Sequence, residues 1–196
     1  MKKIIVSTLV LCIITLVAGM SLAVVYEVTK APIAEAEAKA ALKAYAAIFP
    51  DAQTFEETAV LSQDSANGAV IEKALYAKAD DAYLGYVLTV SSPNGYGGNI
   101  VIAMGVTPEG TLVGVSVISQ NETAGLGAKC KDDKFTSQFA GISGGMVDYT
   151  KSEPASNNQI QAISGATITT SAVVDAVNAG LTYAREAFSD GEGECA

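Results

Sequence analysis

The chain has 196 residues, a formal net charge of −9, and neither histidine nor tryptophan. An acidic chain is unsuited to nucleic acids or anionic lipid surfaces, because both would repel it. The lack of histidine excludes histidine-ligated metals, histidine-ligated haem and Ser-His-Asp catalysis. Cys12, Cys130 and Cys195 lie too far apart for a zinc site, and their odd number does not suggest a disulfide framework. If the chain takes part in chemistry, we expect a bound cofactor to supply it.

An uncharged and mostly apolar run of 22 residues occupies positions 4–25. A helix of that length spans about 33 Å, enough to cross the hydrocarbon of a bilayer. Two lysines precede the run, so we expect the N-terminus in the cytoplasm and the rest of the chain on the outer face of the cell membrane. The alternative is a cleaved signal peptide with small residues at 21–23, but the apolar run continues beyond them. We predict a retained single-pass anchor over residues 1–26.

A connecting helix is expected over residues 27–50, since 33–48 is rich in Ala, Glu and Lys and lacks glycine. Its apolar residues share one face, and Pro50 ends it. These apolar residues are Leu42, Tyr45, Ile48 and Phe49.

The remaining domain is placed at residues 51–190, before an acidic tail at 191–196. The last three of its predicted strands form an antiparallel meander, because turn sequences at 94–98 and 107–110 separate them. A short helix near 132–139 and a loop over 141–158 follow. The predicted strands are 57–61, 69–77, 83–90, 99–106 and 112–119.

The final helix is expected over 172–188, with an apolar stripe on one side. Strands cluster between helices rather than alternating with them, so the fold class is α+β. We predict an antiparallel sheet with packed helices, preceded by one transmembrane helix. The stripe consists of Val173, Val177, Leu181, Ala184 and Phe188.

Residues 163–171 hold five hydroxyl side chains just before the final helix. Hydroxyls at a helix start usually cap its free N–H groups, with Thr170 or Ser171 here as the starting residue. The same position also favours a phosphate, because the N–H groups and the helix dipole attract negative charge. Local chemistry leaves both interpretations open. The glycine-rich loop at 122–127 likewise allows both a structural and a cofactor-binding interpretation. The turn at 95–98 is typical of a hairpin.

Two segments together resemble the motifs of covalent FMN-binding domains. Ser-Gly-Ala-Thr-Ile-Thr at 164–169, running into a helix, resembles the flavinylation motif of that family. Glu-Thr-Ala-Gly-Leu-Gly at 122–127 resembles its Glu-Thr-Pro-Gly-Leu-Gly loop. With the single anchor, nearly the whole chain resembles the G subunit of the Rnf electron-transport complex. The close relative of that protein is the C subunit of the sodium-translocating NADH:quinone reductase.

The resemblance implies that Thr167 carries FMN through a phosphoester, installed from FAD by a flavin transferase. Small neighbours would admit the phosphate, and the 122–127 loop would line the flavin, with Tyr86 or Tyr96 packed on the ring. Glu122 is alternatively expected to hold the backbone of its own loop. The implied FMN contacts besides Thr167 are Ser164, Gly165, Ala166, Thr169, Thr170, Glu122, Thr123, Gly125, Leu126 and Gly127.

Two positions depart from the family pattern. Gln161 replaces an acidic residue that often lies three positions before the motif serine, which weakens the case for recognition by the transferase. Ala124 replaces the usual proline, which loosens the loop and removes no chemistry.

By resemblance, the chain relays electrons among the other subunits of a membrane complex. That complex moves electrons between reduced ferredoxin and NAD, coupled to Na⁺ or H⁺ transport. The sequence has no dinucleotide-binding fingerprint. Its one transmembrane span carries no charged residue that could bind an ion, so we expect flavin carriage alone. The alternatives are the corresponding protein of the quinone reductase, a non-redox anchored binding domain, and a serine–lysine hydrolase using Ser164 or Ser119.

Overall fold

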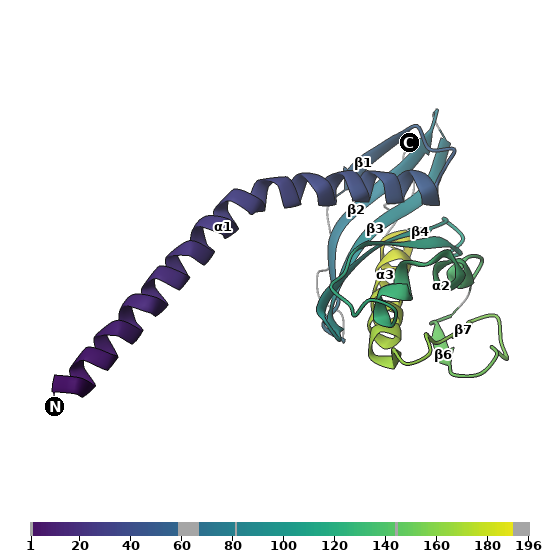
Figure 1. Cartoon of the computed structure of the whole chain (residues 1–196). Coiled ribbons are helices and arrows are strands. Elements are labelled where there is room, and N and C mark those ends of the chain that lie inside the picture. The colour runs from purple at the N-terminus through teal and green to yellow at the C-terminus, as the bar shows by residue number, and fades with distance from the viewer. Residues whose placement is uncertain (1, 59–66, 81, 144, 190–196) are drawn as a thin grey trace. The chain divides into compact units, whose positions relative to one another are not determined.

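The computed structural model describes residues 2–58, 67–80, 82–143 and 145–189 (Figure 1). The chain divides into two compact units, Met1–Lys39 and Ala40–Ala196. Helix α1 (Lys2–Ile48) is continuous through this division, so the expected anchor and connecting helix are parts of one helix. The domain boundaries at residues 26 and 50 stay predictions, and the acidic tail lies outside the described residues.

In the first unit, the stretch of α1 over residues 4–25 is uncharged and mostly apolar on all sides. Helix α1 is the one helix within the described part of the chain that is long and apolar enough to cross a membrane. Large side chains such as Ile4, Leu16 and Val25 are exposed along it. A helix that is apolar all round is ordinarily buried in a large core or in a membrane. This pattern matches a lipid-facing span.

The second unit is built on a five-stranded sheet in which every neighbouring pair is antiparallel. The predicted meander is confirmed, and two earlier strands extend it, so the strands follow one another in chain order. The predicted strand at 57–61 was placed too late, and residues 59–61 lie outside the described structure. The strands are β1 (Thr54–Thr58), β2 (Val70–Ala79), β3 (Ala82–Gly95), β4 (Gly98–Val106) and β5 (Leu112–Ser119).

Helices cover both faces of this sheet, which explains the nearly unbroken apolar sequence of β3. Tyr86 and Leu88 face α3 (Thr167–Ser189), whereas Val87 packs with the last turns of α1. On that second face, the hydroxyls of Tyr45 and Thr89 form a buried hydrogen bond of 2.6 Å. A strand buried on both faces loses its polar alternation.

Leu42 does not join the face of α1 that packs on the sheet, contrary to the prediction, and is 60% exposed. The packed face follows a spacing of three or four residues through Ala41, Ala44, Tyr45 and Ile48. Leu42 follows Ala41 by one residue, about 100° further around the helix, and so points away from the sheet.

The apolar stripe predicted for the last helix is confirmed. Its first four residues are buried, and Phe188 packs against the same core. The helix lies close to the sheet at Gly180, where an added Cβ would come within 3.0 Å of Met104 Cε. The helix begins five residues before the predicted position, and the cause lies in the hydroxyl-rich turn described below.

The segment between β5 and α3 is more structured than expected. In place of one short helix, it forms η1 (Gly127–Lys131), α2 (Asp133–Thr136) and η2 (Ser137–Phe139). The loop expected over 141–158 contains β6 (Asp148–Thr150), which pairs in parallel with β7 (Gln159–Gln161). Strand β7 then leads the chain directly into the hydroxyl-rich turn.

Candidate cofactor site

The site is organised by the turn that precedes α3. The Ala166 N–H donates to the Ile163 carbonyl at 3.0 Å, and the Thr170 N–H donates to the Ala166 carbonyl at 3.0 Å. Gly165 has a φ of +77°, a conformation that favours glycine. Since the first helical bond ends at Ala166, the N–H groups of Thr167, Ile168 and Thr169 have no acceptor within the helix.

The prediction that Thr170 or Ser171 starts the helix was wrong, because the helix begins at Thr167. The buried hydroxyl of Thr170 donates to the Ala166 carbonyl at 2.9 Å and accepts the Ile163 N–H at 3.1 Å. Through these two bonds, Thr170, a residue within the helix, stabilises the turn that precedes it. Thr167 is therefore the first residue of the helix rather than one step outside it, and its side chain is half-buried.

Glu122 connects the two motif segments. Its Oε2 accepts a hydrogen bond of 2.5 Å from the Thr169 hydroxyl, and its Oε1 accepts the Gly97 N–H at 2.8 Å. Both Glu122 and Thr169 are buried. Gly127 lies against this pair, where an added Cβ would come within 2.6 Å of Thr169 Oγ. The Glu122 carboxylate thus holds the β3–β4 turn and α3, rather than the backbone of its own loop.

The 122–127 loop is closed by one carbonyl. The Thr123 carbonyl accepts N–H groups from Leu126 and Ala128, both at 3.1 Å. Leu126 is 45% exposed, and its Cδ2 lies 3.3 Å from the position that a Cβ on Gly165 would take. The loop therefore rests on the turn before α3.

Two clefts meet at Thr167. The smaller one, of about 600 Å³, is mainly apolar, and the larger one, of about 820 Å³, carries three lysines. Thr167 and Gly165 line both. The apolar cleft is lined by Tyr96, Glu122, Thr123, Leu126, Gly165, Ala166, Thr167, Ile168 and Thr169.

The structure gathers eight of the eleven predicted site residues around these clefts. Thr170, Gly125 and Gly127 do not line either one. Of the two tyrosines, Tyr96 lines the apolar cleft, whereas Tyr86 is fully buried in the core and packs on Phe188, so the expectation for Tyr86 was wrong.

The hydroxyls of Thr169 and Thr170 are already bonded to protein groups. Both side chains are almost fully buried. Whether these two residues contact a cofactor stays a prediction.

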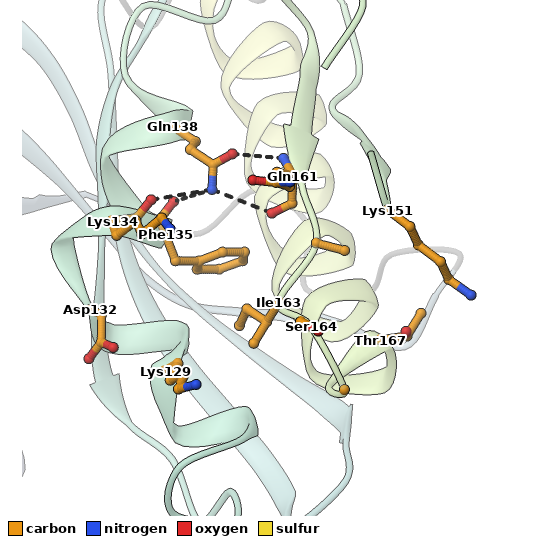
Figure 2. A pocket seen from close by; sticks show the side chains of 12 residues that line it. Lys129, Asp132, Lys134, Phe135, Gln138, Lys151, Gln161, Ile163, Ser164 and Thr167 are labelled. Carbon is orange, nitrogen blue, oxygen red and sulfur yellow. Dashed lines mark hydrogen bonds between the residues drawn. The ribbon is translucent and has the colours of Figure 1, made fainter. Parts of the chain in front are cut away.

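The larger cleft contains residues that the sequence did not single out (Figure 2). Gln138 forms part of its wall and is hydrogen-bonded to the backbone of β7. Its Oε1 accepts the Gln161 N–H at 2.7 Å, and its Nε2 donates to the Gln161 carbonyl at 3.4 Å. The same Nε2 donates to the Lys134 carbonyl at 3.3 Å and to the Phe135 carbonyl at 3.5 Å. A single side chain thus joins α2 to the strand that leads into the Ser164 turn.

Cys130 belongs to η1 and is fully buried. Burial raises the pKa of its thiol to about 11, and the nearby Glu122 carboxylate adds to this effect. A thiol with so high a pKa is a poor nucleophile at neutral pH.

Comparison with known proteins identifies the family. Residues 95–182 match the FMN-binding domain, and residues 1–48 match the RnfG N-terminal region. The chain is 31% identical to the G subunit of the Na⁺-translocating ferredoxin:NAD⁺ oxidoreductase complex of Acetobacterium woodii, over 87% of this chain and 86% of that protein. The chain belongs to the RnfG family. Its identity to the G subunit of the proton-translocating ferredoxin:NAD⁺ oxidoreductase complex of Clostridium ljungdahlii is 32%, over 85% and 84% of the two chains.

Solved structures share the fold. The C subunit of the Na⁺-translocating NADH-quinone reductase from Parabacteroides distasonis aligns with a TM-score of 0.51 and 23% identity, over 59% of this chain and 62% of that one. The NqrC structure from Shewanella oneidensis gives a TM-score of 0.51 and 18% identity, over 71% and 70%. The predicted α+β fold class is thereby confirmed.

The site's own chemistry fits FMN, the cofactor of the matched domain. The first turn of α3 offers N–H groups for a phosphate, and the turn before it carries small residues that leave room for one. The apolar cleft beside it offers Leu126 and Ile168 to a planar ring. Both motif segments lie within the matched residues 95–182.

Proposed function

We propose that this chain is a membrane-anchored flavoprotein subunit that carries FMN covalently on Thr167. It relays electrons within an ion-translocating ferredoxin:NAD oxidoreductase complex of the kind named for its relatives. The observation that carries the proposal is the position of Thr167, in the first turn of α3 and on the wall of both clefts.

Accessibility favours Thr167 among the five hydroxyls of 163–171. Thr169 and Thr170 are buried and hydrogen-bonded, and Ser171 lines neither cleft. Ser164 is exposed but lines only the larger cleft. Thr167 alone of the five combines a reachable hydroxyl with contact to both clefts, so an attached group can extend into either.

The residues of this chain would bind and orient the flavin, which itself supplies the electron transfer. The phosphate would lie at the free N–H groups of Thr167 and Ile168, where the helix dipole favours its charge. The ring would lie in the apolar cleft against Leu126 and Ile168, under Tyr96. Glu122 would keep the two walls of this cleft in register through its bond to Thr169.

The corresponding protein of the quinone reductase remains the nearest alternative, because it shares the fold and the same flavin chemistry would apply. Three relatives with more than 30% identity over most of their length are G subunits, which favours the ferredoxin:NAD complex. A serine–lysine hydrolase that uses Ser164 has less support, because no hydrogen bond joins Ser164 to a lysine in the described part of the chain. A non-redox binding domain has less support, because it does not account for the match of residues 95–182 to the FMN-binding domain.

In-gel flavin fluorescence after denaturation tests the covalent link. The full chain coexpressed with its flavin transferase should fluoresce, and Thr167→Ala should be dark, while the matched Thr182→Ala keeps the signal. A dark wild type, with the transferase shown to be active on another acceptor, would refute the covalent flavin. A fluorescent Thr167→Ala would move the attachment to another hydroxyl.

The anchor and its orientation are part of the same proposal. The apolar run continues beyond the small residues at 21–23, which supports a retained span rather than a cleaved leader. The two lysines before it favour a cytoplasmic N-terminus, with the flavin domain on the outer face of the cell membrane. Protease added to spheroplasts should digest the flavin domain. Protection in spheroplasts, with digestion only in inverted vesicles, would reverse the orientation.

A further inference from the structure

The larger cleft at Thr167 is a positive region on an acidic chain. Three of the chain's twelve basic residues, Lys129, Lys134 and Lys151, line it, against a single acidic residue, Asp132. All three lysines are exposed. None of them forms a salt bridge with a residue in the described segments, where the ion pair within 4.0 Å is Lys78 with Glu56. Their charge is therefore available to an incoming group.

The lysines come from separate segments that meet beside the turn that precedes α3 and Thr167. Lys129 belongs to η1, Lys134 to α2, and Lys151 follows β6. Figure 2 shows Lys129 and Lys151 on different sides of the cleft, with Ser164 and Thr167 between them in this view. Gln138 fixes this arrangement, because it holds the backbone of Gln161 against α2.

The chemistry of flavin attachment brings negative charge to this place. The Thr167 hydroxyl oxygen forms a bond to the flavin-side phosphorus of FAD, and the bond from that phosphorus to the AMP phosphate breaks. AMP leaves, the hydroxyl proton passes to a base of the transferase, and no electrons change hands. A diphosphate must therefore approach Thr167 on a chain whose net charge of −9 repels it.

We propose that the cleft lined by Lys129, Lys134 and Lys151 is the docking surface for the flavin transferase in its FAD-loaded form. The inference rests on the covalent flavin proposed above. Its lysines attract the diphosphate of the bound FAD and so draw the transferase to Thr167. An enzyme that transfers FMN to this residue can reach it through the lysine-lined cleft, since Thr167 lies on its wall. The flavin ring then enters the apolar cleft on the other side of Thr167.

The test measures initial rates of covalent flavin incorporation into the flavin-free full chain in detergent, with purified transferase and FAD. The Lys129→Gln/Lys134→Gln/Lys151→Gln variant should react about tenfold more slowly at low salt, because steering raises association rates by about that factor or more. The wild-type rate should fall steeply between about 0.05 M and about 0.5 M salt as the charges become screened. The triple variant should show little salt dependence.

A matched variant controls for net charge. Lys43→Gln/Lys73→Gln/Lys131→Gln removes the same three positive charges from exposed positions outside the cleft, and should react at the wild-type rate. Replacement of the three cleft lysines by arginine should restore the rate, since the charge returns. The melting temperature of each variant shows whether a slow rate reflects damage to the fold.

Three results would overturn the proposal. The cleft variant could match the wild type in rate and salt dependence, or the control variant could be slowed equally. Alternatively, the cleft variant could react normally but carry a flavin with a shifted absorption spectrum and potential, in which case the ring itself fills the cleft. Failure of the covalent-flavin proposal is distinct, because the wild type would then incorporate no flavin at all.

Discussion

Glu122 joins three segments that lie far apart in the sequence. Its carboxylate binds the Gly97 N–H in the β3–β4 turn and the Thr169 hydroxyl in α3, and its own backbone begins the 122–127 loop. A buried carboxylate needs such donors, because an unsatisfied one carries a large desolvation cost. The pair therefore fixes the loop relative to Thr167, which lies two residues before Thr169.

Thr169→Val tests this role. Valine keeps the shape but removes the donor, leaving Glu122 Oε2 buried without it. The free energy of unfolding should fall by about 2 kcal/mol, the usual cost of losing a hydrogen bond to a charged group. Denaturation of the full chain in detergent measures this. The matched change is Thr182→Val, whose exposed hydroxyl donates to the Asn178 carbonyl of the same helix. Equal effects of the two variants would argue against a special role for Thr169.

At the scale of elements, the position of the turn before α3 depends on the hydrogen bonds that fix β7. The Gln138 side chain bonds to the Gln161 backbone as a neighbouring strand would, since it both accepts the Gln161 N–H and donates to the Gln161 carbonyl. Gln138→Ala should speed hydrogen exchange at the Gln161 N–H and slow flavin incorporation at Thr167, because the turn becomes mobile. Gln53→Ala, which removes one exposed bond to Asp80, is the control. Unchanged exchange in Gln138→Ala would contradict the proposed support of β7.

The aromatic cluster between α3 and the sheet predicts a loss of stability in alkali. Burial raises the pKa of Tyr86, and its hydroxyl donates to Tyr76 at 3.2 Å. The unfolded tyrosine ionises near pH 10, so the stabilisation is complete below that pH and is lost as pH rises toward the higher folded value. The unfolding free energy should fall above pH 10, and less steeply in Tyr86→Phe. An identical slope in both proteins would disprove this assignment.

For the molecule as a whole, the sequence predicted the elements whose pattern is local. The meander, the stripe on the last helix and the apolar span followed from periodicity and turn residues. The start of α3 was missed because Thr170 closes the turn through its own hydroxyl, and hydroxyl-rich segments ordinarily suggest a cap. The short strands β6 and β7 were missed because their pairing is not local.

The candidate site was likewise predicted only in part from the sequence. Motif resemblance placed Thr167, Glu122 and Leu126 together, and the structure brings these residues to one cleft. Residue spacing gave no indication of the lysine cleft or of Gln138, since these side chains meet only through the fold. The bond from Thr169 to Glu122 likewise joins positions 47 residues apart.

The most direct test of the central claim is peptide mapping of the mature protein by mass spectrometry. The full chain, purified from cells that contain the transferase, is denatured, digested and fragmented. We expect one flavin-bearing peptide, with the FMN phosphate on the side-chain oxygen of Thr167, and none from Thr167→Ala. FMN that is released on denaturation, or that maps to Ser164, Thr169 or Ser171, would contradict the assignment.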